Sequence, residues 1–208
     1  MHVKGLEISM HDPRAWQAMA LTYACAPAGG RHMDGETIFM ENEDRIISYP
    51  ELGSDRLDRL STTRKADIAF KIQNLWAALS AAGYCLLACA TGTSQAYTIA
   101  LNVEFLNLVT GLNFSYDEFV KAGERIYNIK RAFGVRHGLT KKDDVLPSRF
   151  LSESRRQLTK DGYRKTVALL DKMLPEYYAI RGWDTETGKP TREKLSELNL
   201  GYITEELY

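Results

Sequence analysis

Apolar side chains recur at helical spacing along most of the chain, and they predict a protein built from helices. The clearest run begins at Phe119, after which apolar residues return every three or four positions. Ser115 and Glu118 precede this run with the spacing of a capping box, in which each side chain bonds the other residue's backbone N–H. Gly134 and Gly138 punctuate its end. We therefore expect a long helix here with one apolar face.

The first fifty residues predict one helix followed by a loop. Asp12 and Pro13 have the form of an N-cap followed by proline at the first helical position. The apolar spacing that follows predicts an amphipathic helix that stops before Pro27. Residues 27–54 are rich in Gly, Pro, Asp and Glu and indicate a loop, with room for a brief extended piece at Thr37–Phe39.

The middle of the chain predicts two consecutive helices. A long helical pattern begins near Ser54, shows apolar steps of four, three and four from Ile68, and ends or bends at Gly83. Small residues at 90–94 indicate a turn. The segment Tyr97–Val109 is apolar on nearly all sides, which is typical of a central buried helix.

The last third predicts a charged loop over residues 139–158 and then two more helices. The first of these carries an apolar face from Tyr163 onwards and is expected to be kinked or divided at Pro175. Thr191 is placed to cap a short helix that runs through Leu198. Strand signals are almost absent, so the fold class is all-α.

Composition narrows the possible functions. The 208 residues include 27 basic and 27 acidic side chains, and this balance gives no general attraction to nucleic acid. The N-terminus lacks the apolar core of a signal peptide. Cys25, Cys85 and Cys89 are odd in number and cannot all pair within the chain, which favours a reducing, cytoplasmic setting.

One stretch carries no formal charge, between Lys71 and Glu104. It is long enough to span a membrane, but it contains polar residues and glycines such as Gln73, Asn74 and Gly92, which argue against contact with lipid. Two helices buried in the protein core are the simpler interpretation. A sharper one is that these helices surround a neutral, enclosed cofactor cavity.

One segment is specific enough to suggest a family. The run Ile126–Phe150 closely resembles a C-terminal part of the tungsten-pterin aldehyde ferredoxin oxidoreductases. The resemblance extends to Asp12–Arg14 near the start and to Arg181–Asp184 and Pro190–Arg192 near the end. Those enzymes are much longer. The resemblance implies that residues 1–208 form the multi-helical C-terminal module of that family, without the N-terminal pterin-binding domain.

The resemblance also implies a reaction. Family members oxidise aldehydes to carboxylic acids, with water as the source of oxygen. Tungsten, or molybdenum, in a bis-pterin site takes two electrons, and one 4Fe-4S cluster passes them singly to ferredoxin. Because the first pterin motif and three cluster thiols are missing here, we expect the isolated chain to bind neither cofactor and to be inactive. A homodimer is also a possible state.

Four neighbouring residues are the cofactor candidates that the resemblance implies. The segment from Ser80 to Cys85 resembles the second cofactor motif of the family, Asp-x-x-Gly-Leu-Cys. Cys85 would be the fourth thiolate ligand of the cluster, and the backbone at Gly83 and Tyr84 would border the pterin. Ser80 replaces the pterin-contacting aspartate, and Tyr84 replaces leucine. Read without the resemblance, Cys85 is a buried structural thiol.

His32 is the catalytic candidate. It lies in a Gly-rich segment similar to the family's Arg-Gly-x-x-His, whose histidine is implicated near the metal centre. By that resemblance His32 exchanges a proton with the aldehyde oxygen, work that suits an imidazole. The alternative is an exposed loop histidine. The run Lys141–Asp144 indicates a solvated loop, or a loop pinned by ion pairs.

Other functions stay open at this point. The chain could be one subunit of a split enzyme, or a non-catalytic helical module that binds a partner through an exposed apolar surface. It could also be a different enzyme that uses Cys85 and Cys89, four residues apart, as a redox or metal pair. Phosphate loops, dinucleotide fingerprints and nucleophile elbows are missing from the sequence.

Overall fold

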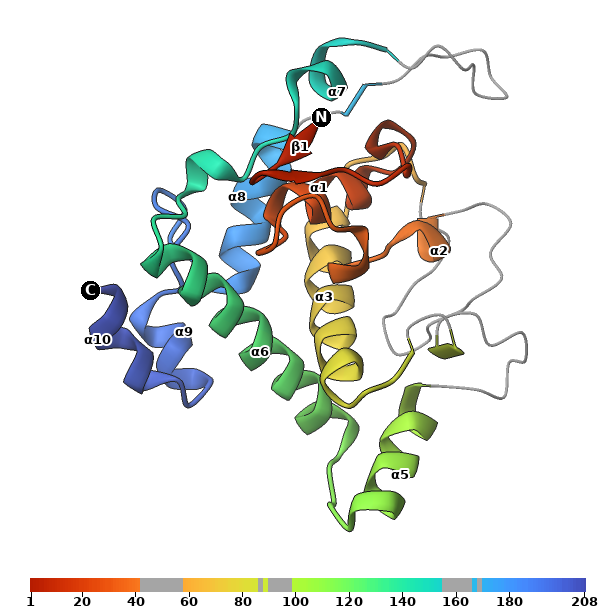
Figure 1. Ribbon diagram of the computed structural model, residues 1–208, viewed down its shortest axis with the longest axis vertical. Helices are drawn as coiled ribbons and strands as arrows, with labels where there is room; N and C mark the ends of the chain where they lie inside the picture. Colours follow the sequence, from red (N-terminus) through yellow and green to blue (C-terminus); the bar gives the residue numbers. More distant parts are fainter. Residues whose placement is uncertain (42–57, 86–87, 90–98, 155–165, 168–169) are drawn as a thin grey trace.

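The computed structural model describes residues 1–41, 58–85, 88–89, 99–154, 166–167 and 170–208. Within these residues helices dominate, as expected for an all-α protein, and the sheet found there is one small hairpin (Figure 1). Its strands, β1 (His2–Val3) and β2 (Leu6–Glu7), pair antiparallel. Lys4 and Gly5 form the turn with positive φ angles. No helix of the described chain is long and apolar enough to cross a bilayer.

The described residues form a series of short and long helical elements. In chain order they are η1 (Pro13–Ala15), α1 (Gln17–Cys25), η2 (His32–Asp34), α2 (Ile38–Glu41), α3 (Lys65–Ala81), α5 (Ile99–Thr110), α6 (Tyr116–Arg136), η4 (Lys141–Asp143), α7 (Ser148–Ser152), α8 (Leu170–Arg181), α9 (Arg192–Glu197), η5 (Gly201–Ile203) and α10 (Thr204–Leu207).

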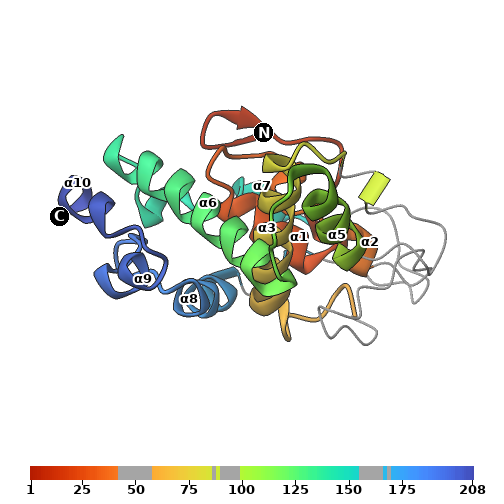
Figure 2. The same ribbon diagram turned by 90° about the horizontal axis from the view of Figure 1, so that it is seen from below.

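Helix α3 is the centre of the molecule. It packs against α6, α8 and α1, and Figures 1 and 2 show it between these helices. Its apolar positions Ile68, Ile72 and Leu75 are buried as the spacing predicted, and burial of each contributes about 2 kcal/mol. At the crossing with α6, a Cβ on Gly123 would lie 1.8 Å from the carbonyl oxygen of Asn74, so only glycine permits this close approach.

The sequence signals at the ends of α6 are confirmed. The backbone N–H of Glu118 donates to Ser115 Oγ at 3.2 Å, and that of Ser115 donates to Glu118 Oε2 at 2.8 Å. The helix passes through Gly134 and ends before Gly138, whose φ is +93°. Leu139 N–H then bonds the carbonyl of Gly134 at 2.9 Å, which satisfies a carbonyl that the helix end leaves free.

The uncharged stretch includes polar residues of α3 that lie in the core of the protein. Arg181 of α8 is fully buried, and it donates to Gln73 Oε1 at 2.8 Å and to Asn74 Oδ1. Its guanidinium carbon lies 4.1 Å from the centroid of the Tyr127 ring. In the described residues no carboxylate forms a salt bridge with Arg181, so amide oxygens and aromatic faces stabilise this cation. Gln73 and Asn74 of the stretch therefore serve the core of the protein.

The loop predicted over residues 139–158 is more ordered than expected. It contains η4 and α7, and the expectation of a solvated Lys141–Asp144 run is wrong for Asp144, which is fully buried. The Asp144 carboxylate bonds Lys4 Nζ and Arg131 Nη2, each at 2.8 Å. The structure therefore agrees with the alternative expectation, a loop held in place by ion pairs.

Two expectations near the N-terminus are corrected. Helix α1 is buried on every side and is not amphipathic, because α3 and α8 pack on it. The piece predicted as extended at Thr37–Phe39 leads into helix α2. Its Glu41 carboxylate accepts from the N–H groups of Ala18 (3.1 Å) and Met19 (3.3 Å) and pairs with buried Lys65. These long-range bonds favour a helical turn over an extended segment.

Helix α5 overturns the strongest burial prediction. It was expected to be central, yet in the chain described here only Ile99, Asn102 and Val103 of this helix are buried. Leu108 and Val109 expose 74% and 86% of their surface. Figure 1 shows α5 at the lower end of the molecule, away from α1 and α8. An apolar sequence pattern predicts that a helix is shielded from water, but it does not identify the surface that shields the helix.

The remaining boundaries differ in detail. The long central helix begins at Lys65, and the described residues 58–64 before it are not helical, so the expectation of a helix from near Ser54 is wrong over these residues. Position 54 itself, the turn at 90–94 and Tyr163 lie outside the described residues. Helix α8 contains Pro175 without being divided there. Thr191 caps α9 by accepting from Lys194 N–H at 3.2 Å, as predicted.

Candidate functional site

The cofactor candidates lie at the turn that ends α3. Gly83 has a φ of +80°, and the N–H groups of Gly83 and Tyr84 donate to the carbonyls of Ser80 (3.2 Å) and Leu79 (3.0 Å). This is a Schellman arrangement, which needs a left-handed residue just after the helix and so selects glycine. The turn leads the chain away from α3 toward Cys85.

The turn leaves these residues open to the surroundings. Ser80 and Cys85 are exposed, and a Cβ on Gly83 would meet no atom within 4 Å. Tyr84 differs, because its hydroxyl donates to the backbone carbonyl of Asn102 at 2.7 Å and ties the turn to α5. The backbone at Gly83 and the Cys85 thiol are therefore accessible to a large group approaching from outside this chain.

The three thiols have different environments. Cys25 is fully buried, and burial raises its pKa. Cys89 is also buried, and its thiol lies 3.6 Å from Asn102 Oδ1; burial, and then the charge of Cys85, raise the pKa of Cys89. A raised pKa keeps a thiol protonated, and the thiolate is the form that binds metals. Cys85 is the exposed thiol of the three, contrary to the reading of it as a buried structural residue.

His32 occupies a half-buried position in η2. Its ring centroid lies 4.7 Å from that of His11, with an interplanar angle of 47°. Its neighbours Met33 and Asp34 line a small cleft together with Ser80 of α3. The structure therefore brings η2 and the last turn of α3 to the same cleft, and it does so by packing α3 against η2.

The sequence reasoning missed two residues beside His32. Side-chain ligand atoms of His11, His32 and Glu36 all lie within 4.8 Å of one another. Desolvation lowers the pKa of His32, helped by His11 and Arg31, whereas burial raises the pKa of Glu36 to about 7. His32 and Glu36 are four residues apart, and this spacing could have suggested from the sequence that they lie together. No sequence pattern placed His11 with them.

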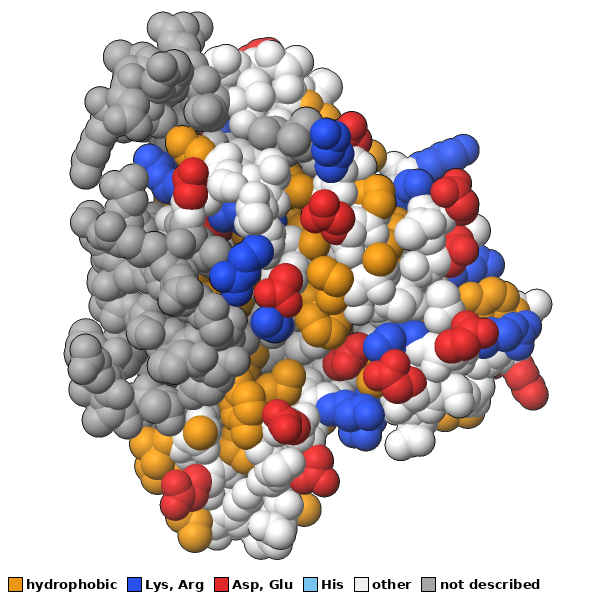
Figure 3. All heavy atoms as spheres, turned by 180° about the vertical axis from the view of Figure 1, so that it is seen from behind, with side chains coloured by type: hydrophobic (Ala, Val, Ile, Leu, Met, Phe, Trp, Pro, Cys, Tyr) orange, Lys and Arg blue, Asp and Glu red, His pale blue; other side chains and the backbone are white. Residues whose placement is uncertain are grey.

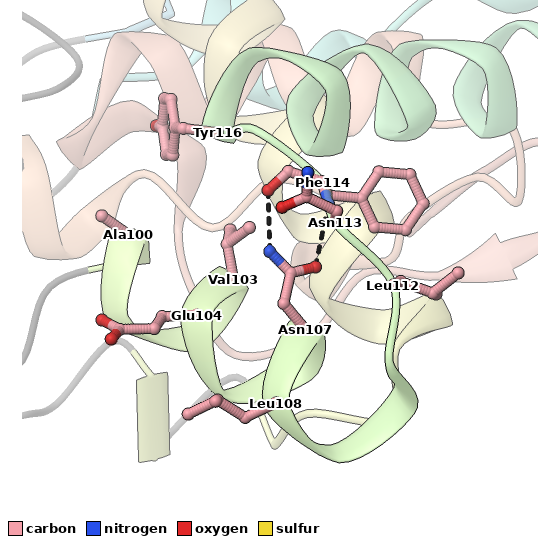
Figure 4. Close-up of a pocket in the computed structure, with 9 residues that line it drawn as sticks. All are labelled: Ala100, Val103, Glu104, Asn107, Leu108, Leu112, Asn113, Phe114 and Tyr116. Atoms are coloured by element: carbon pink, nitrogen blue, oxygen red, sulfur yellow. Dashed lines mark hydrogen bonds between the residues drawn. The ribbon is translucent and has the colours of Figure 1, made fainter.

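A second hollow lies along α5, and it too was missed. Its volume is about 450 Å³, and it lies between α5 and the segment that leads into α6 (Figure 4). Asn107 holds the two sides together, because it donates to the carbonyl of Phe114 at 2.8 Å and accepts from Phe114 N–H at 2.9 Å. The walls are mainly apolar, including Val103 and Leu108, and Glu104 supplies one charge.

Comparison with known sequences identifies relatives along nearly the whole chain. Residues 1–200 match the family described as aldehyde ferredoxin oxidoreductase, domains 2 & 3. The tungsten-containing aldehyde ferredoxin oxidoreductase of Pyrococcus horikoshii is 36% identical over 202 residues, and that of Pyrococcus furiosus 37% over 201. These alignments cover 96% of this chain and 30% and 31% of the relatives, so the chain spans about a third of their length.

A solved structure shares the fold. The active-site complex BamBC of benzoyl coenzyme A reductase, in complex with 1,5 dienoyl-CoA, superposes with a TM-score of 0.64 at 20% identity. The similarity covers 97% of this chain and 32% of that one. The family match over residues 1–200 and the identities of 36% and 37% show that the chain belongs to the aldehyde ferredoxin oxidoreductase family, whose domains 2 and 3 it matches.

Proposed function

We propose that this chain forms one wall of the cofactor site of a tungsten-pterin enzyme that oxidises aldehydes to carboxylic acids. The observation that carries the proposal is the exposed Cys85 thiol beside an open glycine turn, in a chain that belongs to this family. When bound, the tungsten-pterin group supplies the two-electron oxidation of the aldehyde, with water as the source of oxygen and ferredoxin as acceptor of the electrons.

The residues at the turn fit this role in part. An iron–sulfur cluster is held by thiolates, usually four. Cys85 is placed to supply one of them, because it is exposed, while burial keeps Cys25 and Cys89 protonated and enclosed. The other three thiolates must come from another polypeptide segment. The open space at Gly83 lets a bulky group approach the backbone.

Ser80, Tyr84 and His32 then take distinct parts. The Ser80 hydroxyl, exposed at the cleft, is able to hydrogen bond the pterin in place of the family's carboxylate. Only the backbone of Tyr84 is available, since its phenol is engaged with Asn102. Desolvation lowers the pKa of His32, so its imidazole is neutral near pH 7 and ready to accept a proton.

The proposal is tested by assembling the chain with the polypeptide that carries the missing pterin and cluster motifs. Cys85→Ser should abolish the cluster's paramagnetic signal and aldehyde oxidation in that assembly. Cys89→Ser is the matched control and should retain both. His32→Gln should lower kcat and remove one limb of its pH profile while the cluster stays intact. Equal effects of the two cysteine variants would contradict the assignment of Cys85.

The chain alone provides a second test. We expect it, purified without oxygen, to contain no stoichiometric tungsten and no iron–sulfur cluster and to oxidise no aldehyde. Elemental analysis and the visible spectrum measure this directly. A stoichiometric 4Fe-4S spectrum from the isolated chain would show that the ligand assignment is wrong.

The exposed face of α5 favours a second candidate function, that of an interaction module. Phe105, Leu108, Val109 and Leu112 are exposed together on or just after this helix, and Figure 3 shows apolar side chains gathered around that end of the molecule. Monomers seldom expose large apolar patches. The partner proposed for this face is the region of the relatives, about two thirds of their length, that this chain does not cover.

The role of this face as an interface is tested by a variant that places one charge on it. Val109→Lys should prevent assembly with the complementary polypeptide in a pull-down, because a lysine would be buried without a partner. The urea midpoint of the variant chain should match the wild type, since Val109 is exposed. Lys172→Glu, at an exposed position of α8, serves as the control. Assembly that survives Val109→Lys would place the interface elsewhere.

A further inference from the structure

Three side chains beside η2 share the properties of a metal ligand set. His11 precedes η1, His32 begins η2, and Glu36 follows that turn, so three short segments bring them together. One ligand atom from each lies within 4.8 Å of the other two. The combination of two imidazoles and one carboxylate is a common donor set for divalent transition metals.

Among the described residues, the two imidazoles and one oxygen of Glu36 have no hydrogen-bond partner. In the part of the chain that the structure describes, no hydrogen bond or salt bridge engages the imidazole of His11 or of His32. Ring contact with each other is the interaction that the two imidazoles make. Glu36 accepts one hydrogen bond, from Ile38 N–H to Oε1 at 2.8 Å, and its other oxygen has none. Of the three side chains only Glu36 is buried, and buried polar groups are usually paired, so its second oxygen calls for a partner.

The charge of Glu36 is also uncompensated. Its side chain is only 5% exposed, yet no lysine or arginine among the described residues forms a salt bridge with it. The nearby charge of Glu41 adds to the cost of ionising it. Other buried carboxylates here behave differently, since Glu41 pairs with Lys65 and Asp144 with Arg131. Burial of an isolated carboxylate costs several kcal/mol, and a bound cation removes that cost.

We propose that His11, His32 and Glu36 form a binding site for one divalent transition-metal ion of the zinc class. Each imidazole supplies one nitrogen, and Glu36 supplies the oxygen that Ile38 does not occupy. His11 and His32 are both partly exposed, so an ion has a path to the site and at least one coordination position is left for water or another ligand.

This site is separate from the proposed cluster ligand. Cys85 lies past the end of α3, whereas the three ligands lie around η2. The metal proposal needs no tungsten, pterin or aldehyde. It does share His32 with the proposed proton transfer, and an imidazole nitrogen bound to an ion cannot accept a proton, so at His32 the two roles are alternatives. If the proposed oxidase function fails, the metal site can still be present, and the reverse also holds.

Co²⁺ titration of the tag-free, full 208-residue chain tests the proposal. The readout is the visible d–d absorption of bound cobalt, followed by displacement with Zn²⁺. We expect saturation at one equivalent. His11→Asn and Glu36→Gln should each weaken cobalt binding by at least about tenfold. Mutation of residues that only hydrogen-bond a metal ligand already reduces metal affinity by about that factor. His137→Asn is the matched control, because His137 lies outside the cluster at the end of α6.

Folding is checked separately in each variant. Glutamine at position 36 keeps a carbonyl oxygen for Ile38 N–H, so Glu36→Gln should remain folded. The urea midpoint of each variant, measured without metal, establishes this. Non-saturating cobalt absorption, or the same affinity in wild type and in folded Glu36→Gln and His11→Asn, overturns the proposal. Loss of binding in His137→Asn alone overturns it as well.

Discussion

Replacement of Asp144 by asparagine should be among the most destabilising single changes in this chain. Its carboxylate is fully buried and bonds two cations, Lys4 Nζ and Arg131 Nη2, each at 2.8 Å. It also accepts the hydroxyl hydrogen of Tyr178. These partners come from the hairpin, α6 and α8, so this one carboxylate holds three parts of the fold together.

The expected loss of stability follows from the buried charges that Asp144→Asn leaves without a counter-charge. The amide keeps the shape of the side chain but carries no charge, so two buried cations lose their counter-charge. Arg131 retains a bond to the carbonyl of Gly188 at 2.9 Å, which compensates only in part. Removal of one partner from a buried ion pair costs about 3 to 5 kcal/mol. With an m-value of about 2 kcal/mol/M, the urea midpoint should fall by about 2 M.

Urea denaturation followed by circular dichroism measures this change. Glu153→Gln is the matched control, because it also replaces a carboxylate by an amide. Glu153 pairs with Arg149 at 2.8 Å, but both side chains are more than half exposed, and such pairs contribute about 0 to 1 kcal/mol. A loss below about 1 kcal/mol for Asp144→Asn, similar to that of the control, would refute the reasoning about buried charge.

Three further predictions concern stability, each measured by urea denaturation. Gly123→Ala should lower the free energy of unfolding by about 3 kcal/mol, because the new Cβ would clash with the Asn74 carbonyl, whereas Gly201→Ala meets nothing within 4 Å; equal losses would contradict this. Ser115→Ala should cost about 1 kcal/mol through the lost cap, and no change would show that the cap is dispensable. Because burial raises the pKa of Glu36 from 4.5 to about 7, the folded chain binds the proton more tightly than the unfolded chain, and stability should fall as pH rises through that window. With a chelator present, Glu36→Gln should lack this slope, and an unchanged slope would contradict the assignment.

Local signals in the sequence determined the helices and much of their ends. The capping box at Ser115, the Thr191 cap and the glycine after α3 act within a few residues, so they are legible without knowledge of the fold. The resemblance to the family was legible for the same reason, because it rests on contiguous residues such as Ile126–Phe150.

The tertiary structure decided which surfaces are covered and which distant side chains meet. An apolar pattern states that a helix avoids water, but only packing showed α1 to be enclosed on all sides and α5 to expose Leu108. The burial of Asp144 and the meeting of His11 with Glu36 likewise depend on contacts between residues far apart in the chain. Such contacts produce no periodic pattern in the sequence, because each joins two segments whose separation along the chain is arbitrary.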